Sequence, residues 1–357
     1  LTVTGVQTCA LPICTVRRAL LLTVVLLLLT SCSSLSSAVK GVINQKPTPV
    51  HSFTGLPGED APVLAAKIDD TNAAHPQIGI DQADVVYVEQ VEAGLTRLLA
   101  IFSSQIPEKI GPIRSVRISD IDLLAQYGKV GFAYSGAQSK MRPVVAAANL
   151  IDLGAERNPP TIYTRDPNRT SPVNMVLLAP SLLEKALAQH QSDLAISKPM
   201  GWSFGKKPTG GKAIEKIVID WPNATYSATW SPDEKRWLLA HNGRPDFDAD
   251  GKQLGSPTLV IQNLTISPSI YGDKFGGITP LSESVGAGSG YLLRDGEIFP
   301  VKWNRPDAAS GTTWVLDNGA EKAEPADFAP GQIWFLLTDK SPTITYIAPE
   351  AKPSKSK

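Results

Sequence analysis

The chain has 357 residues, of which 42% are apolar and 19% are charged. This length exceeds one hydrophobic core of ordinary size and predicts two domains, and the composition is that of a globular protein rather than a disordered or bilayer-embedded one. Thirty-four basic residues balance 34 acidic ones; without residues 1–31, which contain Arg17 and Arg18 and no acid, 32 bases face 34 acids, a net charge of −2. We therefore expect no nucleic-acid partner, and any anion site has to be local.

The first 31 residues have the composition of a leader rather than of a folded domain. Residues 1–14 resemble a translated sequencing-adapter artefact and are left out of the fold prediction. Residues 15–31 carry the basic pair Arg17-Arg18 and then the apolar run Ala19–Leu29. That run is too short to span a bilayer as a helix but is typical of a secretory signal peptide.

The signal peptide ends in Leu29-Thr30-Ser31-Cys32, which resembles a lipobox. In a lipobox the cysteine is lipidated and becomes the first residue of the mature chain, so we expect attachment to the cell membrane through Cys32, on the extracytoplasmic face. The alternative is an ordinary secreted protein with a cysteine near its cleavage site. Cys9, Cys14 and Cys32 all precede the folded part, which therefore has no cysteine for a disulfide.

After Cys32, residues 32–60 are rich in Ser, Pro, Thr and Gly and predict a flexible tether, and residues 349–357 predict a basic, disordered tail. Between them, residues 61–191 mix strand and helix patterns and predict an N-terminal α/β domain. Its expected strands are Val63–Ile68, Asp84–Glu89, Leu95–Ser103 and Val130–Tyr134, the second and third pairing across Gly94. Its expected helices are Val116–Tyr127, Arg142–Asn149 and Leu182–Gln189, the last with Ser181 as N-cap.

The second half has a different character, with a linker at 192–214 and a β-rich domain at 215–348. All seven tryptophans lie at or after Trp202, and we expect most of them in the core. Turn pairs such as Asn242-Gly243 and Asp295-Gly296 separate short β-rich runs, and Tyr291–Leu293 with Ile298–Phe299 predict a hairpin. The predicted fold class is α+β, an N-terminal mixed α/β domain followed by a mainly antiparallel β domain.

Several segments carry a family resemblance. They are Ala83–Glu89, Val91–Arg97, Lys109–Arg117, Arg165–Pro167 with Pro172 and Asn174, and Val285–Gly290 running into Arg294-Asp295-Gly296. These segments resemble the YerB-like bacterial lipoproteins, which pair an N- and a C-terminal domain of unknown function. The order and spacing of the segments match that family from Pro62 to Leu337. The chain departs from that pattern at Ala93, where glycine is usual, at Val173, where histidine is usual, and at His75, where arginine is usual.

Two arginines at the start of a predicted helix are the most suggestive cluster. Arg114 and Arg117 would oppose the helix dipole, so another interaction should offset them. One hypothesis is an anion-binding site for phosphate or carboxylate, joined by Arg97 and Arg165. The alternative is a structural ion-pair network in which Glu89, Glu92 and Asp120 neutralise the arginines. Asn174 is a further candidate polar partner.

No cofactor is predicted. The acids Asp69, Asp70, Asp81, Asp84, Glu89 and Glu92 invite a metal or acid–base hypothesis, but acids at strand ends are usually solvated. The histidines His51, His75, His190 and His241 are too scattered in the sequence to propose a zinc site, and no His-Glu-x-x-His motif is present. We therefore predict no metal ligands. Gly205–Lys212 lacks the frame of a phosphate-binding P-loop.

Three functional hypotheses follow. The first is a non-enzymatic envelope lipoprotein that binds or regulates the cell-wall machinery through protein or polymer contacts. The second is an enzyme or carrier that handles phosphorylated envelope glycopolymers through the arginine site, an idea that also rests on a faint likeness of Ala83–Arg97 to wall-polymer transferases of the LytR type. The third is a purely structural surface protein. The sequence names no catalytic residue.

Overall fold

The structure, a computed structural model, describes residue 2, residues 48–273 and residues 276–347. The predicted signal peptide, Cys32, most of the tether and the predicted tail at 349–357 lie outside the described residues. The described chain from Pro49 onward belongs to one compact unit. None of its described helices combines the length and the apolar character needed to cross a membrane.

Three α-helices and 21 strands are defined among the described residues. The helices are α2 (Ile118–Ala125), α3 (Arg142–Ala147) and α4 (Ala179–His190). The strands of the first half are β1 (Leu64–Asp69), β2 (Val85–Gln90), β3 (Thr96–Phe102), β4 (Lys109–Ile110), β5 (Val130–Ala133), β6 (Leu150–Asp152), β7 (Tyr163–Arg165) and β8 (Met175–Leu178). Those of the second half are β9 (Lys212–Trp221), β10 (Ala224–Ser231), β11 (Arg236–His241), β12 (Arg244–Pro245), β13 (Gly255–Ser256), β14 (Thr258–Asn263), β15 (Ile266–Gly272), β16 (Ile278–Ser282), β17 (Gly286–Arg294), β18 (Glu297–Arg305), β19 (Thr313–Leu316), β20 (Ile333–Thr338) and β21 (Thr343–Tyr346).

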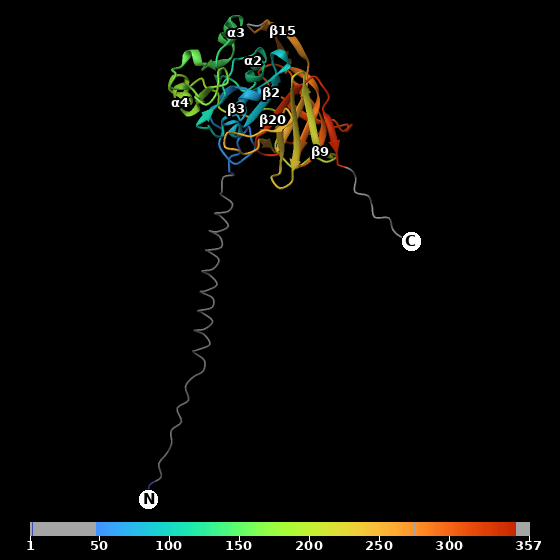
Figure 1. Ribbon diagram of the computed structural model, residues 1–357. Coiled ribbons are helices and arrows are strands. Elements are labelled where there is room, and N and C mark those ends of the chain that lie inside the picture. The colour runs from blue at the N-terminus through green and yellow to red at the C-terminus, as the bar shows by residue number, and fades with distance from the viewer. Residues whose placement is uncertain (1, 3–47, 274–275, 348–357) are drawn as a thin grey trace. The chain divides into compact units, whose positions relative to one another are not determined.

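One mixed sheet runs through both halves of the chain. Its strand order is β12-β11-β10-β9-β18-β17-β14-β20-β2-β3-β1-β5-β6. Strand β20 lies between β14 and β2 and is parallel to both, so the last part of the chain joins the two halves. Figure 1 shows β2, β3 and β20 in the middle of the body, with α4 on one side and β9 on the other.

The central strands are buried on both faces, which explains their nearly continuous apolar sequences. Because side chains alternate along a strand, β2 sends Val86 and Val88 into one core and Val85 and Tyr87 into the other. Six of the seven tryptophans are buried, which confirms their expected place in the core. The charged side chains of β1, β2 and β3 share the Tyr87 face of the sheet.

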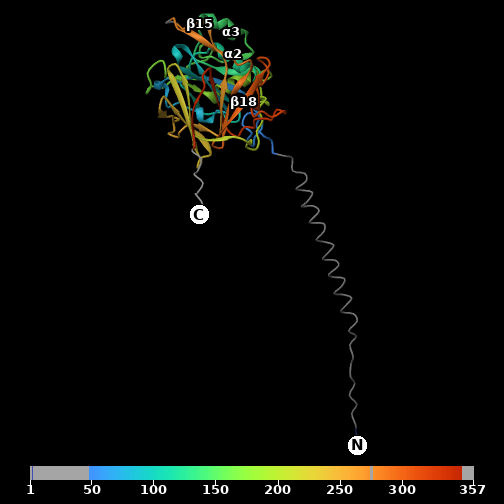
Figure 2. The same cartoon turned by 90° about the vertical axis from the view of Figure 1, so that its right-hand side faces the viewer.

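Most predicted elements are confirmed. Strands β2 and β3 pair antiparallel across Gly94, and β17 and β18 pair across Asp295 and Gly296, which both have positive φ as this turn requires. Helices α2, α3 and α4 lie where the helical spacing predicts them. Helix α2 contacts β16, and Figure 2 shows α2, α3 and β15 close together at one end of the body.

Some predictions were wrong in detail. Helix α4 begins at Ala179 with Leu178 as N-cap, so Ser181 lies inside the helix. The end of the predicted tether is packed, because Phe53 is fully buried and Val50 pairs with Pro57. The molecule is β-rich with mixed sheets, and the clean α+β division is not seen because β20 pairs with strands of both halves.

Candidate functional site

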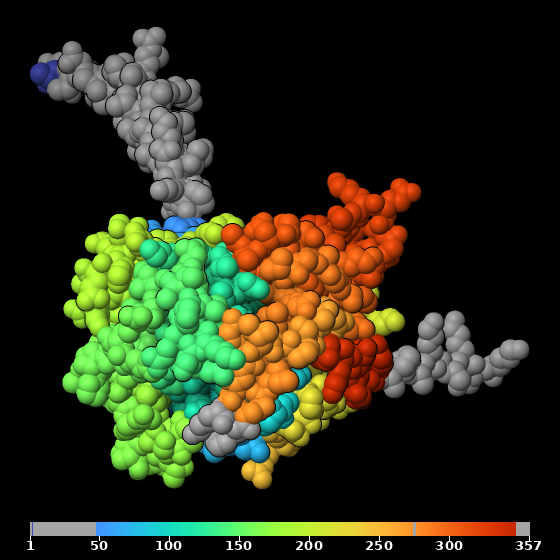
Figure 3. All heavy atoms as spheres, turned by 90° about the horizontal axis from the view of Figure 1, so that it is seen from above, coloured from blue at the N-terminus to red at the C-terminus, as the bar shows by residue number. Residues whose placement is uncertain are grey.

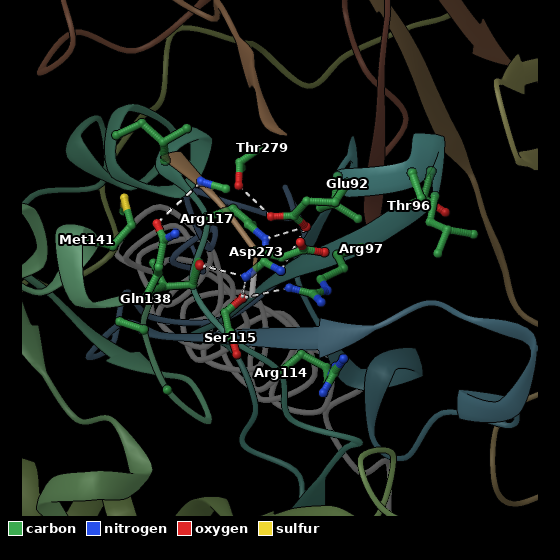
Figure 4. Close-up of a pocket in the computed structure, with 18 of the residues that line it drawn as sticks. Glu92, Thr96, Arg97, Arg114, Ser115, Arg117, Gln138, Met141, Asp273 and Thr279 are labelled. Atoms are coloured by element: carbon green, nitrogen blue, oxygen red, sulfur yellow. Dashed lines mark hydrogen bonds and ion pairs between the residues drawn. The ribbon is translucent and has the colours of Figure 1, made fainter. Parts of the chain in front are cut away.

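A pocket of about 630 Å³ brings together three of the four predicted arginines, Arg97, Arg114 and Arg117. Its walls come from the turn between β2 and β3, the segment before α2, the loop around Gln138, and the β15–β16 hairpin with Thr279. Figure 4 shows Arg97 and Arg114 near Ser115, with Glu92 and Thr279 across the pocket. The acids Glu92, Glu156 and Asp273 also line the pocket, so its charged groups are of both signs, and apolar side chains such as Leu95, Ile118 and Met141 complete the wall.

Two of the arginines form ion pairs with acids. Arg114 Nε lies 2.5 Å from Asp69 Oδ2, at the end of β1. Arg117, the N-cap residue of α2, donates from Nε to Glu92 Oε2 at 2.8 Å, and Glu92 also accepts from the hydroxyl of Thr279. The pKa of Glu92 lies below its usual value, because the Arg117 charge and these hydrogen bonds outweigh the effect of burial.

Arg97 differs from the other two. Its side chain leaves β3 on the charged face of the sheet, and the residue is 8% exposed. Nη1 donates to the carbonyl of Ser115 at 3.2 Å, and no ion pair within 4 Å joins Arg97 to another described residue. Burial, together with the charges of Arg117 and Arg114, lowers the pKa of Arg97 to about 9. The wall of the pocket thus holds a desolvated cation beside two more cations.

The other two acids of the predicted ion-pair network, Glu89 and Asp120, pair with a lysine rather than with an arginine. Glu89 and Asp120 both pair with Lys67 of β1, the Asp120 contact being 2.8 Å, and all three side chains are fully buried. Asp120 also accepts a hydrogen bond at 2.6 Å from the backbone N–H of Arg117, which satisfies the first turn of α2. Sequence reasoning missed Lys67, although a lysine inside the apolar run Leu64–Ile68 indicates a buried partner.

Comparison with known families identifies the two halves of the chain. Residues 53–193 match the N-terminal domain, and residues 217–335 the C-terminal domain, of a family described as "Protein of unknown function (DUF3048)". Together the two matches cover more than half of the chain. The chain belongs to the DUF3048 family. The pocket of this DUF3048 protein is lined from both matched segments, which meet along a seam in the view from above (Figure 3).

The same comparisons point to one relative in Bacillus subtilis. The chain is 44% identical over 54 residues to a protein of strain 168 named "Putative lipoprotein YerB", a stretch that covers 15% of this chain and 16% of that protein. A crystal structure of the YerB protein from Bacillus subtilis matches with a TM-score of 0.68 at 19% identity, over 83% of this chain and 99% of that one. The YerB-like fold with paired domains is thus confirmed. Neither relative's name states an activity.

Arg165 and Asn174, two predicted site residues of this DUF3048 chain, lie elsewhere. Arg165 Nη1 donates to Asn174 Oδ1 at 2.8 Å in an exposed pair, and neither residue lines the arginine pocket. The local pattern could not show this, because β7 and β8 pair with each other and with β4 rather than with the main sheet.

The prediction that acids at the strand ends are solvated was wrong for most of them. Asp69, Asp70, Asp84 and Glu89 are each no more than 2% exposed. The histidines also differ from expectation, because His75 and His241, far apart in sequence, stack with ring centroids 4.4 Å apart. The carboxylate of Asp70 lies 3.3 Å from His75 Nε2 and 3.8 Å from His241 Nε2. The fold therefore creates a second polar cluster that the spacing of the histidines did not predict.

Proposed function

We propose that this DUF3048 protein is a lipid-anchored protein of the extracytoplasmic face that binds an anionic component of the cell envelope in the arginine pocket, acting by binding rather than by catalysis. The observation that carries this proposal is Arg97, a cation that is 8% exposed in the pocket wall and forms no ion pair within 4 Å with a described residue, so that only the more distant charges of Asp69 and Glu92 stabilise it. An anion would supply the missing partner.

The chemistry of the pocket favours an oxyanion. A guanidinium presents several N–H donors in one plane and matches the oxygens of phosphate or carboxylate. Each charge-assisted hydrogen bond contributes about 1.5–3 kcal/mol, so one ligand group shared by Arg97 and Arg114 would bind measurably even in water. A volume of about 630 Å³ accommodates one or two repeat units of a polymer rather than a whole macromolecule. Since the mature chain is close to neutral, attraction of a polyanion would be local and sensitive to salt.

The N-terminal sequence supports the proposed location of the protein. The lipobox pattern ending in Cys32 and the name of the Bacillus relative both support lipid attachment. Cys32→Ala should release the protein from the membrane fraction, because a thioether-linked lipid needs the thiol. Cell fractionation with an antibody measures this, with Ser33→Ala as the matched control. A Cys32→Ala protein that stays in the membrane pellet after a high-salt wash would contradict the anchor.

Binding is tested with two defined polyanions, short poly(glycerol phosphate) for phosphate and poly(glutamate) for carboxylate. Isothermal titration calorimetry should show binding of at least one of them that weakens as salt rises. Arg97→Gln and Arg114→Gln should each weaken it about tenfold or more, as expected from the loss of one charge-assisted hydrogen bond.

Arg165→Gln is the matched control, because Arg165 is exposed and outside the pocket. Its affinity should stay within about twofold of the unchanged protein. Thermal unfolding of each variant verifies that the pocket is still folded. Equal loss in all three variants, or no binding of either polymer, contradicts the arginine site. Shortening of the polymer during incubation would contradict the part of the proposal that excludes catalysis.

A further inference from the structure

A second cluster lies between the two halves of the family fold. Asp70 follows β1, and His75 lies a few residues further on. His241 ends β11, and Asp246 follows β12, both from the second half. The ring of His75 stacks on that of His241 at an interplanar angle of 14°. The cluster borders a cavity of about 450 Å³ that is lined by His75, His241 and Asp246 and gives access from outside.

The acid Asp70 is held from several sides. Its Oδ1 accepts hydrogen bonds from the hydroxyl of Tyr226 at 2.8 Å and from the amide of Gln77 at 3.1 Å. Its Oδ2 accepts from the hydroxyl of Thr96 at 2.5 Å. Because the carboxylate is fully buried and fixed, its position is set before any ligand arrives.

Asp246 fixes the orientation of His75. Asp246 Oδ1 lies 2.7 Å from His75 Nδ1, which turns Nε2 of the same ring toward Asp70 Oδ1, 3.3 Å away. A carboxylate on the far nitrogen of an imidazole is the usual support of a metal-binding histidine, since it selects the tautomer and orients the ring. Asp246 Oδ2 has no hydrogen-bond partner among the described residues, so one oxygen of this buried carboxylate is left without a donor.

His241 supplies the observation that points to a ligand. The residue is 5% exposed, and its Nε2 has no hydrogen-bond partner in the described part of the chain. That nitrogen lies 3.8 Å from Asp70 Oδ2, too far for a hydrogen bond. A buried imidazole nitrogen left without a partner is destabilising, and a metal bond would offset that cost.

We propose that Asp70, His75 and His241 bind one divalent transition-metal ion of the zinc class, with Asp246 as a positioning residue acting through His75. One ligand atom from each of the three residues already lies within 4.8 Å of the others. Tetrahedral zinc ligands at about 2.0–2.1 Å from the ion lie roughly 3.3 Å apart, so the Asp70–His75 separation fits. The His241 ring has to turn out of its stack on His75 and approach the ion, because an imidazole binds a metal in its own plane. Two imidazole nitrogens favour zinc over calcium or magnesium, which prefer oxygen ligands.

The charges around the site favour a cation. Two carboxylates, Asp70 and Asp246, are each no more than 2% exposed in the cluster, so a divalent cation would meet two buried acids. The cavity leaves room for water or another ligand at a fourth position of the ion. Since Asp70 and His75 come from the N-terminal family domain and His241 from the C-terminal one, the ion would link the two domains.

The test uses the full chain in detergent, stripped of metal with a chelator and dialysed. Titration with Zn²⁺, followed by calorimetry and elemental analysis, should give one zinc per chain, and Co²⁺ should give the strong visible absorption of a tetrahedral site. His75→Gln and His241→Gln should each weaken zinc binding at least tenfold. Asp246→Asn should weaken it by about 10–100-fold, the usual effect of losing the support of a metal-binding histidine.

His190→Gln is the matched control, because His190 ends α4 and is not part of the cluster. It should bind zinc like the unchanged chain, and so should Arg97→Gln, which separates this site from the arginine pocket. Circular dichroism shows whether His241→Gln folds. If it does not, His75→Gln gives the same comparison, because the side chain of His75 is 16% exposed and its replacement disturbs the core less. The Co²⁺ spectrum of the unchanged chain tests the site without any variant. No zinc on the full chain, or equal affinity in the His75, His241 and His190 variants, overturns the proposal.

Discussion

At the scale of single residues, the charged face of the central sheet is organised around Lys67. A fully buried lysine is costly unless it is paired, and here it meets two carboxylates, Glu89 and Asp120. Arg97 lies on the same face and is opposite both Asp69 and Glu89 in the strand register. The charges of Asp69 and Glu92 partly stabilise this cation, although no direct ion pair joins it to a described acid.

This arrangement makes stability depend on pH through Glu89. Burial and the neighbouring Asp120 raise the pKa of Glu89 to about 7, despite the opposing effect of Lys67. An acid whose pKa is raised by folding holds a proton that the unfolded chain releases, so its contribution to stability is full below about pH 4.5 and is lost as the pH rises through about 7. Each unit of pKa shift corresponds to about 1.4 kcal/mol.

We expect Glu89→Gln to abolish this pH dependence. The free energy of unfolding of the unchanged protein, measured by chemical denaturation, should fall by about 1–3 kcal/mol relative to the variant between pH 5 and pH 8. Glu108→Gln is the control, because the side chain of Glu108 is 85% exposed. Parallel pH profiles for the unchanged protein and Glu89→Gln would show that Glu89 does not titrate in this range.

At the scale of elements, the sequence predicts what is local. The β2–β3 and β17–β18 hairpins and the three helices follow from alternation, helical spacing and turn residues that lie within about a dozen positions of one another. Contacts between distant segments leave no such pattern. His75 and Asp246 are 171 positions apart, so the histidine cluster could not be predicted. Arg114 and Arg117 could be grouped because both lie at the start of one predicted helix, and of the two arginines added to them Arg97 lines the pocket and Arg165 does not.

The β2–β3 turn contains one residue in an unfavourable conformation. Ala93 has a φ of 57°, where a Cβ atom costs about 1 kcal/mol, and Gly94 follows with a φ of 66°. Ala93→Gly should therefore raise the free energy of unfolding by up to about 1 kcal/mol, since relief of this strain exceeds the added entropy of the unfolded chain.

The control for this substitution is Ala146→Gly, an exposed position inside α3 with ordinary helical geometry. There glycine should lower the free energy of unfolding by about 0.5–1 kcal/mol. Denaturant titration of both variants gives the comparison. Loss of stability in Ala93→Gly as large as in Ala146→Gly would mean that the turn does not strain Ala93. Because Ala93 lines the arginine pocket, its backbone geometry also fixes where Glu92 lies.

At the scale of the whole molecule, we expect the two family domains to fold as one unit, because one sheet runs through both. Strand β20 comes from the end of the C-terminal domain, yet it pairs in parallel with β2 through Val85–Val88 and with β14 along its full length. All six of its residues are buried. Both polar clusters depend on this junction, since the arginine pocket and the histidine cluster each take residues from the two halves.

Two truncations nine residues apart test that dependence. A chain ending at Lys340 keeps β20 and, among the described strands, loses β21, whose residues are mostly exposed, so it should still unfold cooperatively. A chain ending at Gly331 loses β20, which leaves β2 and β14 each unpaired along the edge that faces β20 and opens both hydrophobic cores. We expect this shorter chain to lose its cooperative thermal transition and to aggregate. Should it instead melt cooperatively as a monomer, the two halves would be separate folding units, and the sheet would join them only after each has folded.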